Sequence, residues 1–193
     1  METFEDKLRR VLSEPIALAD YDPAWPSTFE AEAERFVTFF RTGYIRGVEH
    51  VGSTAVPGLA AKPIVDILAF VDDFRLVERT VPALEAAGYD YFFRPAFGDD
   101  GPQYPWLIAR DSAGCRVAHI HVALVADDSQ SERVLFRDRL RSHPEVARSY
   151  AALKRDLAAR FGNDREAYTS AKTAFITRET ALARAESMGK QAQ

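Results

Sequence analysis

A glycine turn in the first third of the chain has the residue types that bind phosphate. Gly52, Ser53 and Thr54 directly follow a β-prone run, so their backbone N–H groups and hydroxyl groups can hold an anion. A P-loop needs four residues between its glycines and a Gly-Lys-Ser/Thr ending, whereas five residues separate Gly52 from Gly58 and Leu59 follows. We expect a phosphate-binding turn that is not a P-loop; a plain connecting turn is the alternative.

Asp66 is the only charged residue in the apolar run Pro63–Val71. A carboxylate buried there without a partner would strongly destabilise the fold. On a strand, Asp66 shares a face with apolar side chains such as Leu68. We expect it to face a cleft near a strand end, to hold a metal ion, or to pair with a base such as Lys62. A structural ion pair is the alternative to a metal or substrate site.

Two histidines lie on one face of a later predicted strand. Alternate residues of a strand point the same way, so His119 and His121 share a face with Val117 and Ala123. Two imidazoles so placed can share a metal ion or meet a phosphate together. Such pairs also occur by chance on half-exposed strands, but the equally isolated Asp66 favours a joint site.

Basic residues of the second half are candidate partners for an anion. Arg137 and Lys154 lie on predicted helices, and Tyr168 and Lys172 are four residues apart on the last one, so these two point the same way. Together with Lys62 we expect these residues to bind a phosphorylated substrate. The alternative is a set of solvated helix faces, the usual role of charged residues on helices.

A mixed α/β front half followed by a helical back half must position these residues. The β-prone runs predict strands at 16–18, 44–51, 63–71, 89–93, 106–110 and 116–125. Helices are expected at 1–12, 26–41, 76–87, 131–141, 142–161 and 164–185. Ser27 or Thr28 is expected to cap the second helix, and Ser142 with Glu145 to form a capping box.

Length and composition fit one domain over residues 1–185, followed by a polar tail at 186–193. A net charge of −4 argues against nucleic-acid binding, which usually requires a basic excess. No apolar run reaches the roughly 18 residues of a membrane span. The charged N-terminus lacks a signal-peptide pattern, and the single cysteine fits a reducing compartment. These features predict a cytoplasmic protein with no nucleic-acid or membrane partner, and they leave the oligomeric state open.

Four blocks of the sequence resemble the GrpB family. They are EHVGSTAVPGLAAKPIVDI (Glu49–Ile67), AHIHV (Ala118–Val122), FRDRLRSHPEVARSYAALK (Phe136–Lys154) and YTSAKTAFI (Tyr168–Ile176). The similarity follows the family's order from about residue 16 to residue 183. It implies an α/β (α+β) nucleotidyltransferase-like fold, with a mixed sheet flanked by helices and a helical C-terminal half. Some members of the family are fused to dephospho-coenzyme A kinase.

The nucleotidyltransferase pattern that this resemblance brings has a Gly-Ser turn and then two carboxylates two residues apart on the next strand. A third carboxylate usually comes from a later strand. Gly52 matches the turn and Asp66 the first carboxylate. Leu68, which cannot bind a metal, occupies the second position, and the later strand offers His119 and His121 instead of an acid.

Two ligand-binding functions stay open, and a scaffold whose interface is the helical back half is a third alternative. One is an enzyme that transfers a nucleotidyl group from a nucleoside triphosphate to a small acceptor. Asp66, His119 and His121 would then be the catalytic residues and would hold a divalent metal ion, either Mg²⁺ or a transition metal. The alternative is a catalytically degenerate module that binds a nucleotide or a coenzyme A-related ligand. In both cases the expected partner is a nucleotide or another phosphorylated small molecule.

Overall fold

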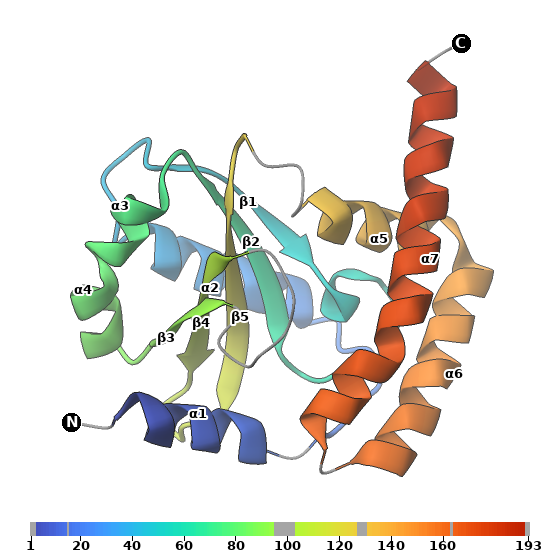
Figure 1. The fold of residues 1–193 in the computed structure, drawn as a ribbon, viewed down its shortest axis with the longest axis horizontal. Helices are drawn as coiled ribbons and strands as arrows, with labels where there is room; N and C mark the ends of the chain where they lie inside the picture. The colour runs from blue at the N-terminus through green and yellow to red at the C-terminus, as the bar shows by residue number, and fades with distance from the viewer. Residues whose placement is uncertain (1–2, 15, 95–102, 127–130, 163, 192–193) are drawn as a thin grey trace.

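The computed structural model describes residues 3–14, 16–94, 103–126, 131–162 and 164–191, and a mixed five-stranded sheet lies at its centre (Figure 1). The strands are β1 (Ile45–Val51), β2 (Val65–Val71), β3 (Asp90–Arg94), β4 (Tyr104–Arg110) and β5 (Arg116–Leu124). Their order is β1-β2-β5-β4-β3; β2 and β5 run parallel, and the other neighbours are antiparallel. The predicted α+β class is confirmed.

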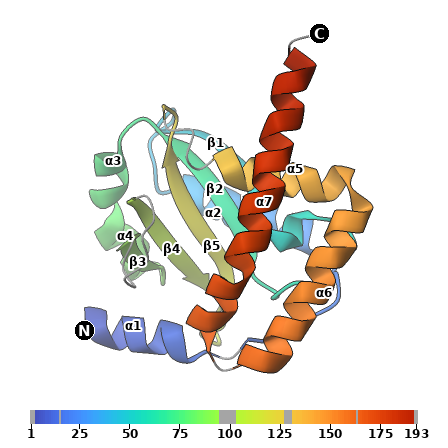
Figure 2. The ribbon, with the colours of Figure 1, turned by 45° about the vertical axis from the view of Figure 1, so that its right-hand side comes forward.

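Helices cover both faces of the sheet. They are α1 (Phe4–Ser13), α2 (Trp25–Val37), α3 (Phe74–Glu78), α4 (Val81–Ala86), α5 (Ser131–Ser142), α6 (Pro144–Phe161) and α7 (Arg165–Gln191), with a short 3₁₀ helix, η1 (Ser53–Ala55), after β1. α2, α3 and α4 pack on one face around Phe36, Ile67 and Ile120, which are fully buried. Figure 2 shows α5, α6 and α7 grouped together, with the C-terminal end of α7 extending past the other two. This helical back half agrees with the sequence.

The face of the sheet away from α2 carries the candidate site. α1 packs there through Val11, against Phe92 and Trp106. Further along the same face, Val134 of α5 packs against Leu68. Asp66, His119 and His121 lie on this face of the sheet, with Leu68.

Two predicted elements differ from the structure. Residues 16–18 form no strand, and the chain there makes only an isolated bridge between Ala19 and Ala61. The predicted helix at 76–87 is two short helices, α3 and α4. Pro82 lies in the first turn of α4, and because proline has no N–H and its ring clashes with the preceding turn, a helix must restart there.

The predicted helix caps are wrong. Ala24 is the N-cap of α2 and makes no side-chain capping bond, while the Thr28 hydroxyl donates to the Ala24 carbonyl. Ser142 ends α5, where its hydroxyl donates to the carbonyl of Asp138. His143 therefore takes the N-cap position of α6. Residues 186–191 of the expected polar tail are helical, since α7 runs to Gln191, and residues 192–193 lie outside the described residues.

Candidate functional site

Parallel pairing of β2 with β5 brings the predicted acid and histidines together. Asp66 lies opposite His119 and Leu68 lies opposite His121, so all four share one face of the sheet. The Nδ1 atom of His119 is 3.2 Å from Oδ1 of Asp66, and Nε2 of His121 is 3.6 Å from the same oxygen. The three side chains therefore form one cluster, as the strand periodicity predicts.

Arg116 determines the tautomer of His119. A guanidinium group can only donate hydrogen bonds, and Nη1 of Arg116 lies 3.4 Å from Nε2 of His119. Nε2 must therefore accept, which leaves the proton on Nδ1, where it is donated to Asp66. Arg116 is itself held by an ion pair with Glu14 and by a bond to the Val11 carbonyl, so the end of α1 supports the site.

Hydrogen-bonding groups on both sides of the ring determine the tautomer of His121. Arg133 donates to the Tyr104 hydroxyl at 3.1 Å, and this hydroxyl lies 3.2 Å from Nδ1 of His121. Nε2 of His121 faces the ionised carboxylate of Asp66, which can only accept, so Nε2 carries the proton and Nδ1 accepts from the Tyr104 hydroxyl. The Nε2 proton of His121 then points to Asp66. Both histidines are neutral, and both direct an N–H at the same carboxylate oxygen.

The charge states follow from this arrangement. Burial alone would raise the pKa of Asp66, but the histidines, foremost His119, outweigh it and hold that pKa far below its usual range. Burial lowers the pKa of His119, and burial with the nearby Arg133 lowers that of His121 to about 3. The carboxylate is thus ionised and the imidazoles neutral over the physiological range.

These side chains do not fit a metal centre. A histidine binds a metal through a ring-nitrogen lone pair, but the lone pair of His119 faces Arg116 and that of His121 faces Tyr104. Among the described residues, no group of three or more His, Cys, Asp and Glu side chains could hold a metal ion. The second carboxylate position of the nucleotidyltransferase pattern is Leu68, which is fully buried.

The glycine turn lies directly against Asp66. Gly52 has φ +73° and ψ −170°, a combination that is open almost only to glycine. A Cβ atom at Gly52 would lie 2.2 Å from Oδ2 of Asp66. Only a residue without a side chain allows the turn to approach the carboxylate this closely. Gly52 therefore determines how near the predicted phosphate-binding turn lies to Asp66.

Lys154 of α6 reaches into the turn. Its Nζ atom donates to Oγ of Ser53 at 2.9 Å and to the Ala60 carbonyl, and it lies 4.8 Å from the ring centroid of Tyr150. The residue is 3% exposed. Burial, together with repulsion from Lys172, lowers the pKa of Lys154 to about 7. A buried ammonium group with two neutral acceptors keeps a third N–H for another partner.

Lys172 and Lys62 lie at the ring of Tyr168. Their Nζ atoms are 4.3 Å and 5.1 Å from its centroid. Burial lowers the pKa of Lys172 to about 8, and the nearby Asp66 opposes this shift. Lys62 and Lys172 therefore share the ring of Tyr168, and the charges of both act on Lys154, which contacts Ser53.

Arg137 and Thr54 serve the scaffold. Arg137 pairs with Glu49 at 2.6 Å and donates to the His50 carbonyl at 2.9 Å. The Thr54 hydroxyl lies 3.0 Å from Nε2 of His50. Arg137 thus fastens α5 to the end of β1, and the Thr54 side chain stabilises the turn, so neither contributes its side chain to the lysine cluster.

No pattern in the sequence selects Arg116, Tyr104 or Tyr150. Arg116 lies three residues before His119, at the start of the same strand, and this spacing is the one signal that could have found it. Tyr104 lies on a neighbouring strand and Tyr150 on α6, so only the folded chain brings them to the histidines and to Lys154.

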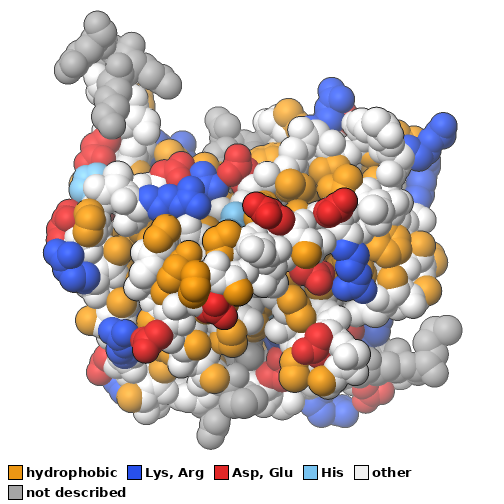
Figure 3. All heavy atoms as spheres, turned by 180° about the vertical axis from the view of Figure 1, so that it is seen from behind, with side chains coloured by type: hydrophobic (Ala, Val, Ile, Leu, Met, Phe, Trp, Pro, Cys, Tyr) orange, Lys and Arg blue, Asp and Glu red, His pale blue; other side chains and the backbone are white. Residues whose placement is uncertain are grey.

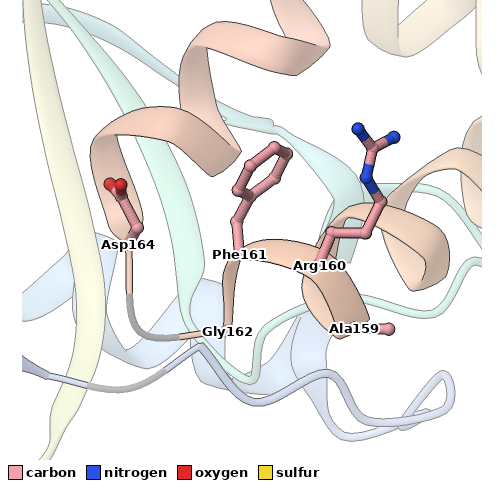
Figure 4. Close-up of a pocket in the computed structure, with 5 residues that line it drawn as sticks. All are labelled: Ala159, Arg160, Phe161, Gly162 and Asp164. Atoms are coloured by element: carbon pink, nitrogen blue, oxygen red, sulfur yellow. The ribbon is translucent and has the colours of Figure 1, made fainter.

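Two hollows elsewhere on the molecule contain none of the predicted residues. One, of about 570 Å³, lies at the turn between α6 and α7 and is lined by Ala159, Arg160, Phe161, Gly162 and Asp164 (Figure 4). The other, of about 700 Å³, lies between α2 and β1, with Phe29 and Val48 in its wall. Figure 3 shows the molecule from behind, with apolar side chains lying among charged ones.

Comparison with protein families gives a match over almost the whole domain. The GrpB protein family model matches residues 15–181. The chain belongs to the GrpB family. A UPF0157 protein of Pseudomonas aeruginosa is 42% identical over 177 residues; the match covers 84% of this chain and 65% of that protein, so the chain spans less than two thirds of that relative. The predicted resemblance is confirmed.

Solved structures agree with this membership. GrpB from Enterococcus faecalis superposes with a TM-score of 0.76 at 31% identity, covering 89% of this chain and 99% of that one. Cid1 poly(U) polymerase superposes with a TM-score of 0.51 at 11% identity, covering 87% of this chain and 53% of Cid1. The Cid1 likeness shows the fold alone, and that fold is nucleotidyltransferase-like.

A dephospho-CoA kinase of Mycolicibacterium paratuberculosis is 29% identical to this GrpB chain over 187 residues. The match covers 85% of this chain and 45% of the kinase, which agrees with the expected link between the two kinds of sequence. No helix within the described ranges combines the length and apolar character needed to cross a bilayer.

Proposed function

We propose that this GrpB-family protein binds a phosphorylated small molecule, with a nucleotide as the expected class, at the cluster formed by Ser53, Lys154 and Lys172. The observation that carries the proposal is that Lys154 and Lys172 are removed from water without a carboxylate partner. Neither has a carboxylate partner within 4.0 Å in the part of the chain that the structure describes. Most other basic residues there are paired, including Arg110, with Asp90 at 2.8 Å.

Removing two ammonium groups from water without a counter-ion is unfavourable, and here it lowers both pKa values. An anion between the lysines would offset that cost. Ser53 adds a hydroxyl group next to the ammonium group of Lys154. Phosphate suits such a site because its oxygens accept several hydrogen bonds at once.

Titration calorimetry with AMP, ADP and ATP tests the proposal. Binding to the wild-type protein is expected to weaken about tenfold or more in Lys172→Met, the size of a charge-assisted hydrogen bond. Arg148→Met is the matched control, because Arg148 is an exposed residue of α6. The proposal fails if no phosphorylated compound binds, or if both variants weaken binding equally.

Nucleotidyl transfer is the second candidate, and one observation favours it. Asp66 keeps 27% of its side chain exposed beside the glycine turn, on a fold that Cid1, a poly(U) polymerase, also has. Incubation with labelled triphosphates, a panel of small acceptors and divalent metals tests it; if no product forms while nucleotide binds, the protein is a binding module.

A further inference from the structure

The second oxygen of Asp66 is free to meet a ligand. Oδ1 lies 3.2 Å from Nδ1 of His119 and 3.6 Å from Nε2 of His121, whereas Oδ2 lies against Gly52 and has no hydrogen-bond partner among the described residues. The carboxylate is partly exposed. An ionised oxygen in that position accepts hydrogen bonds and cannot donate them.

Cations and this carboxylate belong to the same site. Lys154 donates to Ser53 at 2.9 Å, and Gly52, the residue before Ser53, lies directly against Oδ2 of Asp66. The charge of Asp66 also raises the pKa of Lys154 and of Lys172 against the effect of burial. The positive charges of Arg155 and Lys62 lower the pKa of Lys154 further. Arg155 itself lies 3.5 Å from Asp20. A ligand that satisfies the whole site must therefore bring an anion to the lysines and a hydrogen-bond donor to Asp66.

Polyphosphates meet this requirement poorly. In a carboxylate site, a triphosphate depends on metal ions that bridge its oxygens to the acids. Here the histidine lone pairs face Arg116 and Tyr104, so they cannot complete such a bridge. Without it, each added phosphoryl group increases repulsion from Asp66. A single phosphate, which carries a charge of about −1.5 to −2 at neutral pH, matches the two lysines.

We infer that the site recognises a phosphate monoester that carries a hydroxyl or amino donor close to its phosphate, and that it does so without a metal ion. The phosphate contacts Ser53, Lys154 and Lys172, and the donor contacts Oδ2 of Asp66. This inference rests on the proposed function and narrows the substrate class.

Calorimetry with simple probes in the presence of EDTA tests the inference. Inorganic phosphate supplies the anion alone, D-ribose supplies hydroxyl groups alone, and D-ribose 5-phosphate supplies both. ATP is measured with EDTA and with Mg²⁺. Ribose 5-phosphate is expected to bind about tenfold more tightly than phosphate, since a hydrogen bond to a charged group is worth about that factor. ATP is expected to bind more weakly than ribose 5-phosphate in both conditions.

Asp66→Asn gives a test in which the two probes respond in opposite directions. The amide keeps the volume of the carboxylate, removes its charge and can present N–H in place of Oδ2. Ribose 5-phosphate is expected to bind about tenfold more weakly because its hydroxyl group loses the ionised acceptor. Inorganic phosphate is expected to bind several-fold more tightly because the like charge is gone. Asp72→Asn, which changes an exposed carboxylate just after β2, should change neither.

Each other result overturns a defined part of the reasoning. Equal affinity for phosphate and ribose 5-phosphate would remove Asp66 from recognition. Tight binding of ATP that needs Mg²⁺ and is lost in EDTA would overturn the inference but leave the proposed binding function standing. If no phosphorylated probe binds, both fail. If Asp66→Asn unfolds the protein, the comparison of the probes on the wild-type chain still decides.

Discussion

The close approach of Gly52 to Asp66 predicts that a single added methyl group at Gly52 destabilises the protein. In Gly52→Ala the new Cβ atom would lie 2.2 Å from Oδ2 and 2.9 Å from Cγ of Asp66, well inside van der Waals contact. Alanine would also adopt a backbone conformation with φ +73° and ψ −170°, which costs about 1–3 kcal/mol. Overpacking against a fixed side chain adds about 1–3 kcal/mol. The expected loss in the free energy of unfolding is therefore about 2–6 kcal/mol.

Gly58→Ala separates the cost of the backbone conformation from the cost of overpacking against Asp66. Gly58 also has a positive φ, +76°, but a Cβ atom there would meet nothing within 4 Å. This variant should lose only about 1–2 kcal/mol from the left-handed backbone. Urea unfolding of both variants measures the difference, and the histidine resonances should shift only in Gly52→Ala, because displacing Asp66 breaks its bond to His119. Equal losses in the two variants would refute the close approach of turn and carboxylate.

Three further predictions concern ionisable residues. Burial lowers the pKa of His50 to about 4 and, with nearby Arg133, that of His121 to about 3. The unfolded chain therefore takes up protons below pH 6.5 that the folded one does not, and urea unfolding at pH 5 should show a loss of up to about 2 kcal/mol per histidine. The pKa of Lys154 is about 7 in the folded protein and 10.5 in the unfolded chain. Between these pH values the unfolded chain binds more protons, so the free energy of unfolding should rise by about 1.4 kcal/mol per pH unit. Lys154→Met should lack this slope. Arg137→Met should lower the unfolding free energy by about 1–3 kcal/mol, because the His50 carbonyl loses its donor; an unchanged urea midpoint would contradict that role.

The sequence predicts those parts of the site that depend on local periodicity. Strand alternation places His119 and His121 on one face, and the single charge in an apolar run identifies Asp66. The i, i+4 spacing of Tyr168 and Lys172 puts the lysine over the tyrosine ring, where the structure has it at 4.3 Å. In each case one strand or one helix is enough to fix the relation.

Long-range partners could not be predicted in the same way. Arg137 and Lys154 look alike in sequence, since both are basic residues on helices of the back half. The fold places Arg137 beside Glu49 and a carbonyl group, and places Lys154 at Ser53 without a carboxylate. The difference depends on which residues of distant elements they meet, and no pattern within α5 or α6 contains that information.

Packing beneath α5 explains why this chain has one carboxylate where the nucleotidyltransferase pattern has two. Leu68 is not an isolated change at an otherwise open metal site. It packs with Val51, Ala123 and Val134 under α5 and is fully buried. A carboxylate in that cluster would have to be desolvated without a partner. The core beneath α5 thus occupies the second acid position, and the neighbouring donors fix the histidines in neutral forms turned away from a shared ion. What is left for a ligand is one ionised oxygen beside the glycine turn and two lysines without carboxylate partners, an arrangement better suited to holding a phosphate ester than to activating a triphosphate.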